Sequence, residues 1–158
     1  MIFLKNKFSL IFFFLLGVLI FFYLSYEKNT SIQNFNDIKN FDNKFILINF
    51  WAPWCKPCFD EIPDIVNFHD SIQNKDLIIV GPSFGDKANT NEVVKKLNIK
   101  YDVFLAGSDE VEFMEANGNA DFKLPHTILL DPKKNQTFSK IGILKDKDFE
   151  LIKKKLNE

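Results

Sequence analysis

The sequence predicts an α/β domain with a mixed sheet, preceded by one membrane-spanning helix. Two observations predict the domain. Short apolar runs rich in strand formers alternate with segments of helical periodicity, and the last two runs flank a short turn as an antiparallel pair. A third observation, an uncharged stretch over residues 8–26, predicts the membrane helix. The chain has 158 residues and a net charge of −1, which is enough length for one core and offers no basic surface for nucleic acid.

The uncharged stretch follows Lys5 and Lys7 and would span roughly 28 Å as a helix, close to the hydrocarbon core of a bilayer. No small-residue cleavage site follows it, so an uncleaved anchor is favoured over a cleaved secretory signal, with a buried soluble helix as a third alternative. Lysines before the span predict a cytoplasmic N-terminus and an exported domain. We therefore predict a cytoplasmic N-terminus and anchor over residues 1–27, a tether and domain start over 28–40, and the domain over 41–158.

The elements of the domain follow from periodicity and from helix-capping and turn residues. Residues 45–50, FILINF, are apolar throughout and too few for a helix, so they predict a buried strand. Further strands are predicted at 76–83 (closed by Gly81 and Pro82), 101–107, 126–131 and 136–144. Helices are predicted at 56–73, 89–99 (capped by Asn89 or Thr90), 108–118 and 145–157.

Both cysteines of the chain, Cys55 and Cys58, lie where the first strand ends and a helix begins. They could form a redox couple, half of a metal site or a structural disulfide. A helix N-terminus favours a thiolate, so Cys55 is the predicted nucleophile, and Cys58, one turn later, is the predicted resolving thiol. A metal site needs three or four ligands, and only His69 and His126 could be added. A structural disulfide usually closes a longer loop. The pattern favours redox chemistry.

The segment NFWAPWCKPC, residues 49–58, resembles the active-site segment of thioredoxins. With the following EIP it resembles, more narrowly, the membrane-anchored thiol-disulfide reductases of the TlpA/ResA/CcmG type. The later segment KLPHTILLD resembles the cis-proline loop of that family. The resemblance covers roughly residues 41–155 and implies a thioredoxin fold. It also implies a redox-active Cys55–Cys58 disulfide.

The same resemblance assigns residues around the cysteines. It implies a cis peptide bond between Leu124 and Pro125, with Pro125 packed against the cysteine pair. Cytosolic thioredoxins place a buried Asp at the position of Asn49, whereas the reductase subgroup has Asn there and a Glu that matches Glu61. Glu61 is therefore the expected proton carrier for Cys58. The alternative is an ordinary first-turn acid stabilised by the helix dipole.

The resemblance implies an extracytoplasmic thiol-disulfide oxidoreductase at the bacterial inner membrane, facing the periplasm or exterior. It would reduce disulfides of exported proteins, with apocytochrome c as the family-based substrate. The backbone of Leu124 and Pro125 would align the substrate, and Trp54 would form one wall. Electrons would come from a membrane thiol-disulfide transporter, with no cofactor and no metal.

Two other functions stay open from the sequence. A thiol oxidase would use the same residues at a different redox potential. A copper-delivering protein would use the thiols of Cys55 and Cys58 together with the His126 imidazole as ligands.

Overall fold

The computed structural model describes residues 15–18, 32–72 and 76–157. The chain divides into two units, Met1–Ser31 and Ile32–Glu158. In the first unit only residues 15–18 are described, and they are helical. Apart from these four, the predicted anchor at 8–26 lies outside the described residues. Within the described ranges, no helix is both long and apolar enough to span a bilayer.

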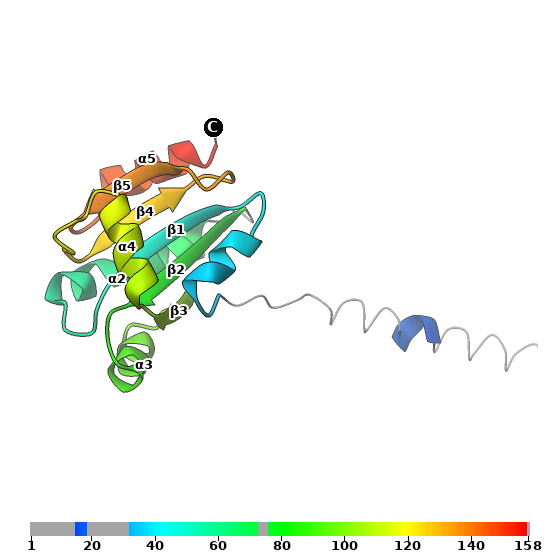
Figure 1. Ribbon diagram of the computed structural model, residues 1–158. Helices are drawn as coiled ribbons and strands as arrows, with labels where there is room; N and C mark the ends of the chain where they lie inside the picture. The colour runs from blue at the N-terminus through cyan, green and yellow to red at the C-terminus, as the bar shows by residue number, and fades with distance from the viewer. Residues whose placement is uncertain (1–14, 19–31, 73–75, 158) are drawn as a thin grey trace, which may run out of the picture. The chain divides into compact units, whose positions relative to one another are not determined.

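The second unit is built on a five-stranded mixed sheet with the strand order β3-β2-β1-β4-β5 (Figure 1). The strands are β1 (Phe45–Phe50), β2 (Leu77–Ser83), β3 (Asp102–Leu105), β4 (His126–Leu130) and β5 (Gln136–Ile141). Strand β1 pairs in parallel with β2 and antiparallel with β4, while β2 and β3 are parallel. Strands β4 and β5 are antiparallel. The predicted mixed sheet with a final antiparallel pair is confirmed.

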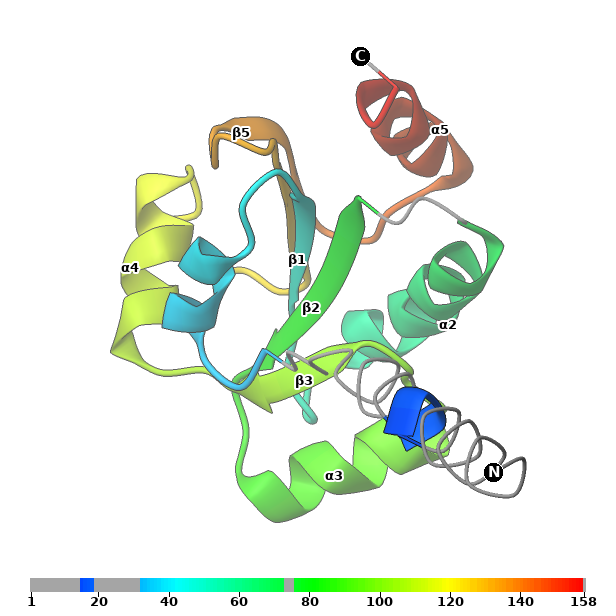
Figure 2. The same cartoon turned by 90° about the vertical axis from the view of Figure 1, so that its right-hand side faces the viewer.

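Helices cover both faces of this sheet. They are η1 (Phe35–Asn40, a 3-10 helix), α2 (Lys56–Ser71), α3 (Lys87–Lys96), α4 (Ser108–Ala116) and α5 (Asp146–Lys155). Figure 2 shows α2 and α5 on one face of the sheet, α4 and η1 on the other, and α3 beside β3. A sheet covered on both faces needs apolar residues on both, which is why β1 is a continuous apolar run with one exception.

The core therefore has two halves, and the alternation of strand side chains assigns each residue to one of them. Leu47 and Trp51 pack in the half that contains α2 and α5. Ile46, Ile48 and Phe50 pack in the half that contains η1 and α4. The exception in β1 is Asn49, whose position in this alternation places it on the α2 face. A fully buried polar side chain there requires hydrogen-bond partners.

Helix α3 begins two residues before the predicted start. Its N-cap is Asp86, rather than Asn89 or Thr90, because the Asp86 carboxylate accepts the Asn89 backbone N–H at 3.0 Å. The Thr90 hydroxyl is instead buried and lies 2.9 Å from the Ser83 hydroxyl.

Strand β2 ends at Ser83, as predicted, and Gly81 and Pro82 lie within its last three residues. Pro82 has no N–H to donate, yet its carbonyl accepts the Trp51 N–H at 3.2 Å. The 3-10 helix η1 was not predicted. It begins at a capping box in which the Asn34 side chain accepts the Asp37 N–H and the Asp37 side chain accepts the Asn34 N–H.

Candidate redox site

The cysteine pair lies at the carboxyl end of β1, where the chain turns into α2. Cys55 is the N-cap of α2 and forms a disulfide with Cys58 in the first turn. Its sulfur also accepts the backbone N–H of Cys58 at 3.3 Å. Pro57 occupies the first turn, where its missing N–H leaves no hydrogen bond unmade. The sulfur of Cys55 therefore sits at the positive end of the helix dipole.

The two cysteines differ in access to solvent. Cys55 is 4% exposed, whereas Cys58 is fully buried in the core cluster on the α2 face. Both cysteines are buried, and the small exposed fraction of the pair belongs to Cys55, which is therefore the cysteine that an incoming sulfur would approach. A thiolate on Cys55 would be stabilised by the helix N-terminus and by the Cys58 N–H. The geometry suits attack by Cys55 and resolution by Cys58.

Glu61 lies one helical turn after Cys58, on the same buried side of α2. Its side chain is fully buried. One carboxylate oxygen accepts the Leu144 backbone N–H at 2.7 Å, and the other accepts the Asn49 side-chain N–H at 2.8 Å. Glu61 is therefore held at both oxygens next to the turn that carries Cys58.

Burial dominates the electrostatics of Glu61. It raises the pKa of the carboxyl from 4.5 to about 7, against the lowering effect of the hydrogen bonds from Leu144 and Asn49. The carboxylates of Asp64 and Asp148 raise it further. A carboxyl with a pKa near neutrality can both take up and release a proton under ordinary conditions. An exposed helix-end acid would not have this property.

Asn49 connects this carboxylate to the sheet. Its side-chain nitrogen also donates to the Thr127 hydroxyl at 2.9 Å, and Asn49 and Thr127 are register partners in β1 and β4. Thr127 lies within the segment KLPHTILLD that resembles the cis-proline loop, but its pairing with Asn49 was not predicted. The contribution of the Leu144 N–H was also missed, because it lies 83 residues from Glu61 and a backbone group carries no sequence signal.

Two of the expected substrate-binding residues lie near the disulfide: Trp54 directly precedes Cys55, and Leu124 packs against the core cluster that holds both cysteines. The Leu124–Pro125 peptide bond is cis, as the resemblance implied. The Pro125 carbonyl accepts the Gly142 N–H at 2.8 Å. Trp54 is 74% exposed, with its indole N–H donating to the Phe84 carbonyl at 3.2 Å. An exposed indole beside a disulfide gives a partner protein an apolar surface to contact.

A family model described as the AhpC/TSA family matches residues 22–155 of the chain. The chain belongs to the AhpC/TSA family. It is 26% identical over 115 residues to the thioredoxin-like protein YneN of Bacillus subtilis, which is 73% of this chain and 66% of YneN. It is 27% identical over 105 residues to the thiol-disulfide oxidoreductase ResA of Geobacillus thermodenitrificans, which is 66% of this chain and 57% of that ResA. The chain thus spans less than two thirds of each of these relatives.

Comparison with a solved structure supports the thioredoxin-like fold of this chain. The thioredoxin-related protein from Neisseria meningitidis serogroup B superimposes with a TM-score of 0.66 at 22% identity. The superposition covers 82% of this chain and 95% of that protein. The thioredoxin-like fold expected from the active-site segment is therefore confirmed.

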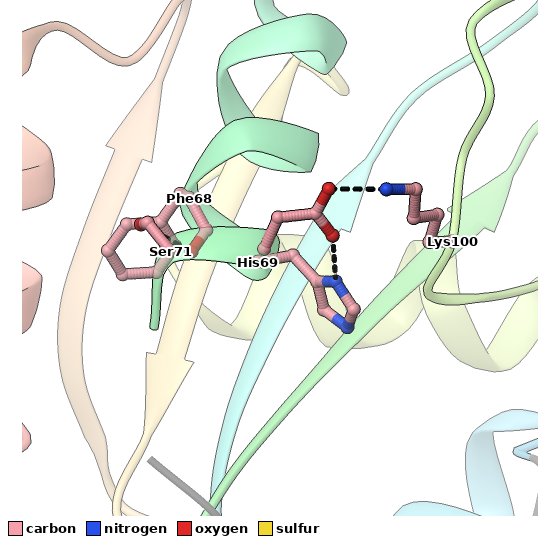
Figure 3. Close-up of polar contacts among 5 residues, drawn as sticks. Phe68, His69, Ser71 and Lys100 are labelled. Carbon is pink, nitrogen blue, oxygen red and sulfur yellow. Dashed lines mark hydrogen bonds and ion pairs between the residues drawn. The ribbon is translucent and has the colours of Figure 1, made fainter. Parts of the chain in front are cut away.

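The two histidines of this AhpC/TSA family chain lie apart from the cysteines. His69 is in the last turn of α2, whereas the cysteines are at its start. In Figure 3 the His69 ring and the Lys100 ammonium approach the same carboxylate, which is that of Asp70. Hydrogen bonding first from Lys100 and then from His69 holds the pKa of Asp70 below its usual value. His69 is thus part of a partly exposed ion-pair group.

His126 lies on the other face of the sheet from the disulfide. Its ring stacks on Phe50 with the centroids 5.9 Å apart, and its Nε2 lies 3.0 Å from the Ser139 hydroxyl. Phe50 belongs to the core half that contains η1 and α4, whereas both cysteines belong to the other half. Across residues 15–18, 32–72 and 76–157, no three His, Cys, Asp or Glu side chains are grouped as metal ligands. This placement argues against the copper-binding alternative.

Proposed function

We propose that this chain is a thiol-disulfide oxidoreductase that reduces disulfides of exported proteins through Cys55 and Cys58. The observation that carries the proposal is the asymmetry of the pair. Cys55 caps a helix and keeps a small exposed fraction, whereas Cys58 is fully buried one turn from a carboxyl group whose pKa is about 7. Relatives named thiol-disulfide oxidoreductase ResA support the same reaction class.

The reaction begins with both cysteines reduced. The Cys55 thiolate attacks one sulfur of the substrate disulfide, so a mixed disulfide forms and the other substrate sulfur leaves as a thiolate. The Cys58 thiol then passes its proton to the Glu61 carboxylate and attacks the Cys55 sulfur. The second substrate sulfur leaves, and the Cys55–Cys58 disulfide closes. Two electrons have moved from the protein to the substrate, which becomes a dithiol.

Substrate would bind across the surface that borders Cys55. The backbone of Leu124 and Pro125 would align an extended segment of the partner, and Trp54 would pack against one side of it. A pocket of about 350 Å³ is lined by Trp54, by Phe59 and by residues of α3 that include Val93. It gives the bound segment room to extend away from the disulfide.

The proposed cellular setting rests on the N-terminal segment and on the family resemblance. An anchor over residues 8–26 would place the domain outside the cytoplasm, at the bacterial inner membrane. That compartment is oxidising, so continued reduction needs electrons from a membrane thiol-disulfide transporter. The apocytochrome c cysteine pair is the substrate that the resemblance suggests.

Trapping the mixed disulfide tests this proposal. The Cys58→Ser variant should accumulate mixed disulfides through Cys55 in bacterial cells, because the resolving thiol is gone. The Cys55→Ser variant should accumulate few, because its remaining thiol is buried. The partners are identified by mass spectrometry after non-reducing electrophoresis, with the double Ser variant as the blank. Equal trapping by both single variants would reject the assigned roles, and no trapping by either would reject the function.

A further inference from the structure

A short segment between β5 and α5 touches both halves of the proposed site. We call residues 142–145 the strap; it joins β5 to α5 (orange in Figure 2). At one end the Gly142 N–H donates to the Pro125 carbonyl at 2.8 Å. Two residues later the buried Leu144 donates its N–H to the Glu61 carboxylate at 2.7 Å. One segment of chain therefore links the cis-proline loop to the carboxyl beside Cys58.

The two contacts lie only two residues apart in the strap. Gly142 has φ of +92°, a conformation that only glycine adopts without cost, so the strap turns sharply there. Leu144 is 1% exposed and packs in the same core cluster as both cysteines. After it, the Lys145 N–H donates to Asp148 at the start of α5. The strap is thus anchored on both sides, with Gly142 as its bend.

The Leu144 hydrogen bond depends on the charge of Glu61. A carboxylate accepts a hydrogen bond roughly twice as strong as a neutral oxygen does. When Glu61 takes the proton from Cys58, its oxygen facing Leu144 becomes neutral and this bond weakens. The groups that face Glu61 are Asp64 on its own helix, Asp148 on α5 and the buried Tyr101 hydroxyl. None of these is a cation that would keep the proton away.

We propose that the strap couples Glu61 to the substrate-binding loop, so that Leu144 and Gly142 act as positioning residues for Pro125. While Glu61 is ionised, the strap is held and the cis-proline loop is fixed in the position that receives substrate. Once Glu61 has accepted the Cys58 proton, the strap loosens and the product is released. The inference rests on the proposed reductase function and adds to it a link between proton transfer and substrate affinity.

A double-mutant cycle on the full chain tests the coupling. Glu61→Gln makes the acceptor permanently neutral, and Gly142→Ala strains the bend. Gly118→Ala is the matched control, because Gly118 has φ of +89° and a Cβ added at either glycine meets no atom within 4 Å. Reduction of insulin, with dithiothreitol as donor, gives KM for a protein substrate. Reduction of 2-hydroxyethyl disulfide reports the thiol chemistry without a peptide.

We expect the effects on KM to be non-additive only for the pair Glu61→Gln and Gly142→Ala. Glu61→Gln and Gly142→Ala should each raise KM for insulin at least about threefold, and together by clearly less than the product of the two factors, since both release the same strap. With Gly118→Ala the factors should simply multiply. If Glu61→Gln and Gly142→Ala also multiply, or if Glu61→Gln leaves the insulin KM unchanged, the coupling is wrong.

Amide hydrogen exchange separates this proposal from the function on which it rests. In Glu61→Gln the Gly142 amide should exchange faster, whereas the Gly118 amide, which donates to the Glu115 carbonyl, should not change. Unchanged exchange at Gly142 would overturn the coupling whatever the activity. A wild-type chain that reduces neither insulin nor 2-hydroxyethyl disulfide would reject the function while leaving this exchange test decisive.

Discussion

Glu61 should make the stability of this protein depend on pH in a direction opposite to that of most carboxylates. Folding buries this side chain completely and raises its pKa from 4.5 to about 7. Between these two values the folded protein binds a proton that the unfolded chain releases. The free energy of unfolding therefore falls as pH rises through this window. The contribution of Glu61 is fully present below pH 4.5 and is lost above about pH 7.

The size of the effect follows from these two pKa values. A rise of roughly 2.5 in pKa, at about 1.36 kcal/mol for each unit, corresponds to about 3 kcal/mol. Because the carboxyl is not exposed, solvent screening does not reduce this figure. Against a total stability of about 5–15 kcal/mol for a domain, the change is easily measured.

The assay is urea unfolding of the wild type and of Glu61→Gln at several pH values between 4 and 8.5, with the disulfide intact. The substitution removes the titration and keeps the size of the side chain. The free energy of unfolding of the wild type minus that of the variant should fall by about 3 kcal/mol across the range. Taking the difference cancels the contributions that the other titrating groups make to the free energy of unfolding. The exposed Glu112→Gln on α4 controls for the loss of a surface carboxylate.

A difference between wild type and Glu61→Gln that stays constant with pH would refute the argument. It would mean that the hydrogen bonds from Leu144 and Asn49 offset the burial, so that Glu61 stays ionised in the folded protein. Glu61 would then be a much weaker base toward the Cys58 thiol, because its pKa would lie near 4.5 instead of near 7. The proposed resolving step would need another base.

Three further predictions concern other residues and the whole chain. Burial lowers the pKa of His126 from 6.5 to about 4, so the unfolded chain binds a proton between these values that the folded protein does not. The free energy of unfolding of the wild type should therefore fall by at most about 3 kcal/mol as pH falls through this window. In urea unfolding, His126→Gln should lack this loss. Trp54→Ala should raise KM for insulin several-fold. It should lower the free energy of unfolding by no more than about 1.5 kcal/mol, because the Trp54 side chain is exposed and makes one hydrogen bond. An unchanged KM would mean that Trp54 is not part of the binding surface. The Cys55–Cys58 couple should have a reduction potential of roughly −200 to −270 mV, measured by equilibration with glutathione buffers. A value above about −150 mV would favour the oxidase over the reductase.

A fifth prediction concerns the N-terminal segment. If residues 8–26 are an uncleaved anchor, the mature chain should begin at Met1 and stay in membranes after a high-salt wash. A mature N-terminus near residue 27 would contradict the anchor and leave the redox assignment intact.

Short-range physics explains why so much of the domain could be predicted from the sequence alone. Strand β1, the start of α2 and the final hairpin depend on side-chain periodicity and turn residues within a few positions of one another. The same is true of the cysteine pair, because a helix N-terminus and one turn of spacing are local features. The start of α3 was misplaced because Asp86 competes with Asn89 and Thr90 as a cap, and the sequence pattern does not rank such neighbours.

The chemistry around the pair was decided by tertiary structure. The sequence placed Glu61 near Cys58, but its pKa depends on burial and on partners far along the chain, such as Leu144 and Asp148. The face occupied by His126 depended on which helices cover each side of the sheet, and this separated it from the cysteines. Helix starts and thiol spacing are set by neighbouring residues, whereas desolvation is set by whatever the folded chain packs around a group. The sequence alone therefore determined where the sulfurs lie, and only the folded chain decided which carboxyl can exchange a proton beside them.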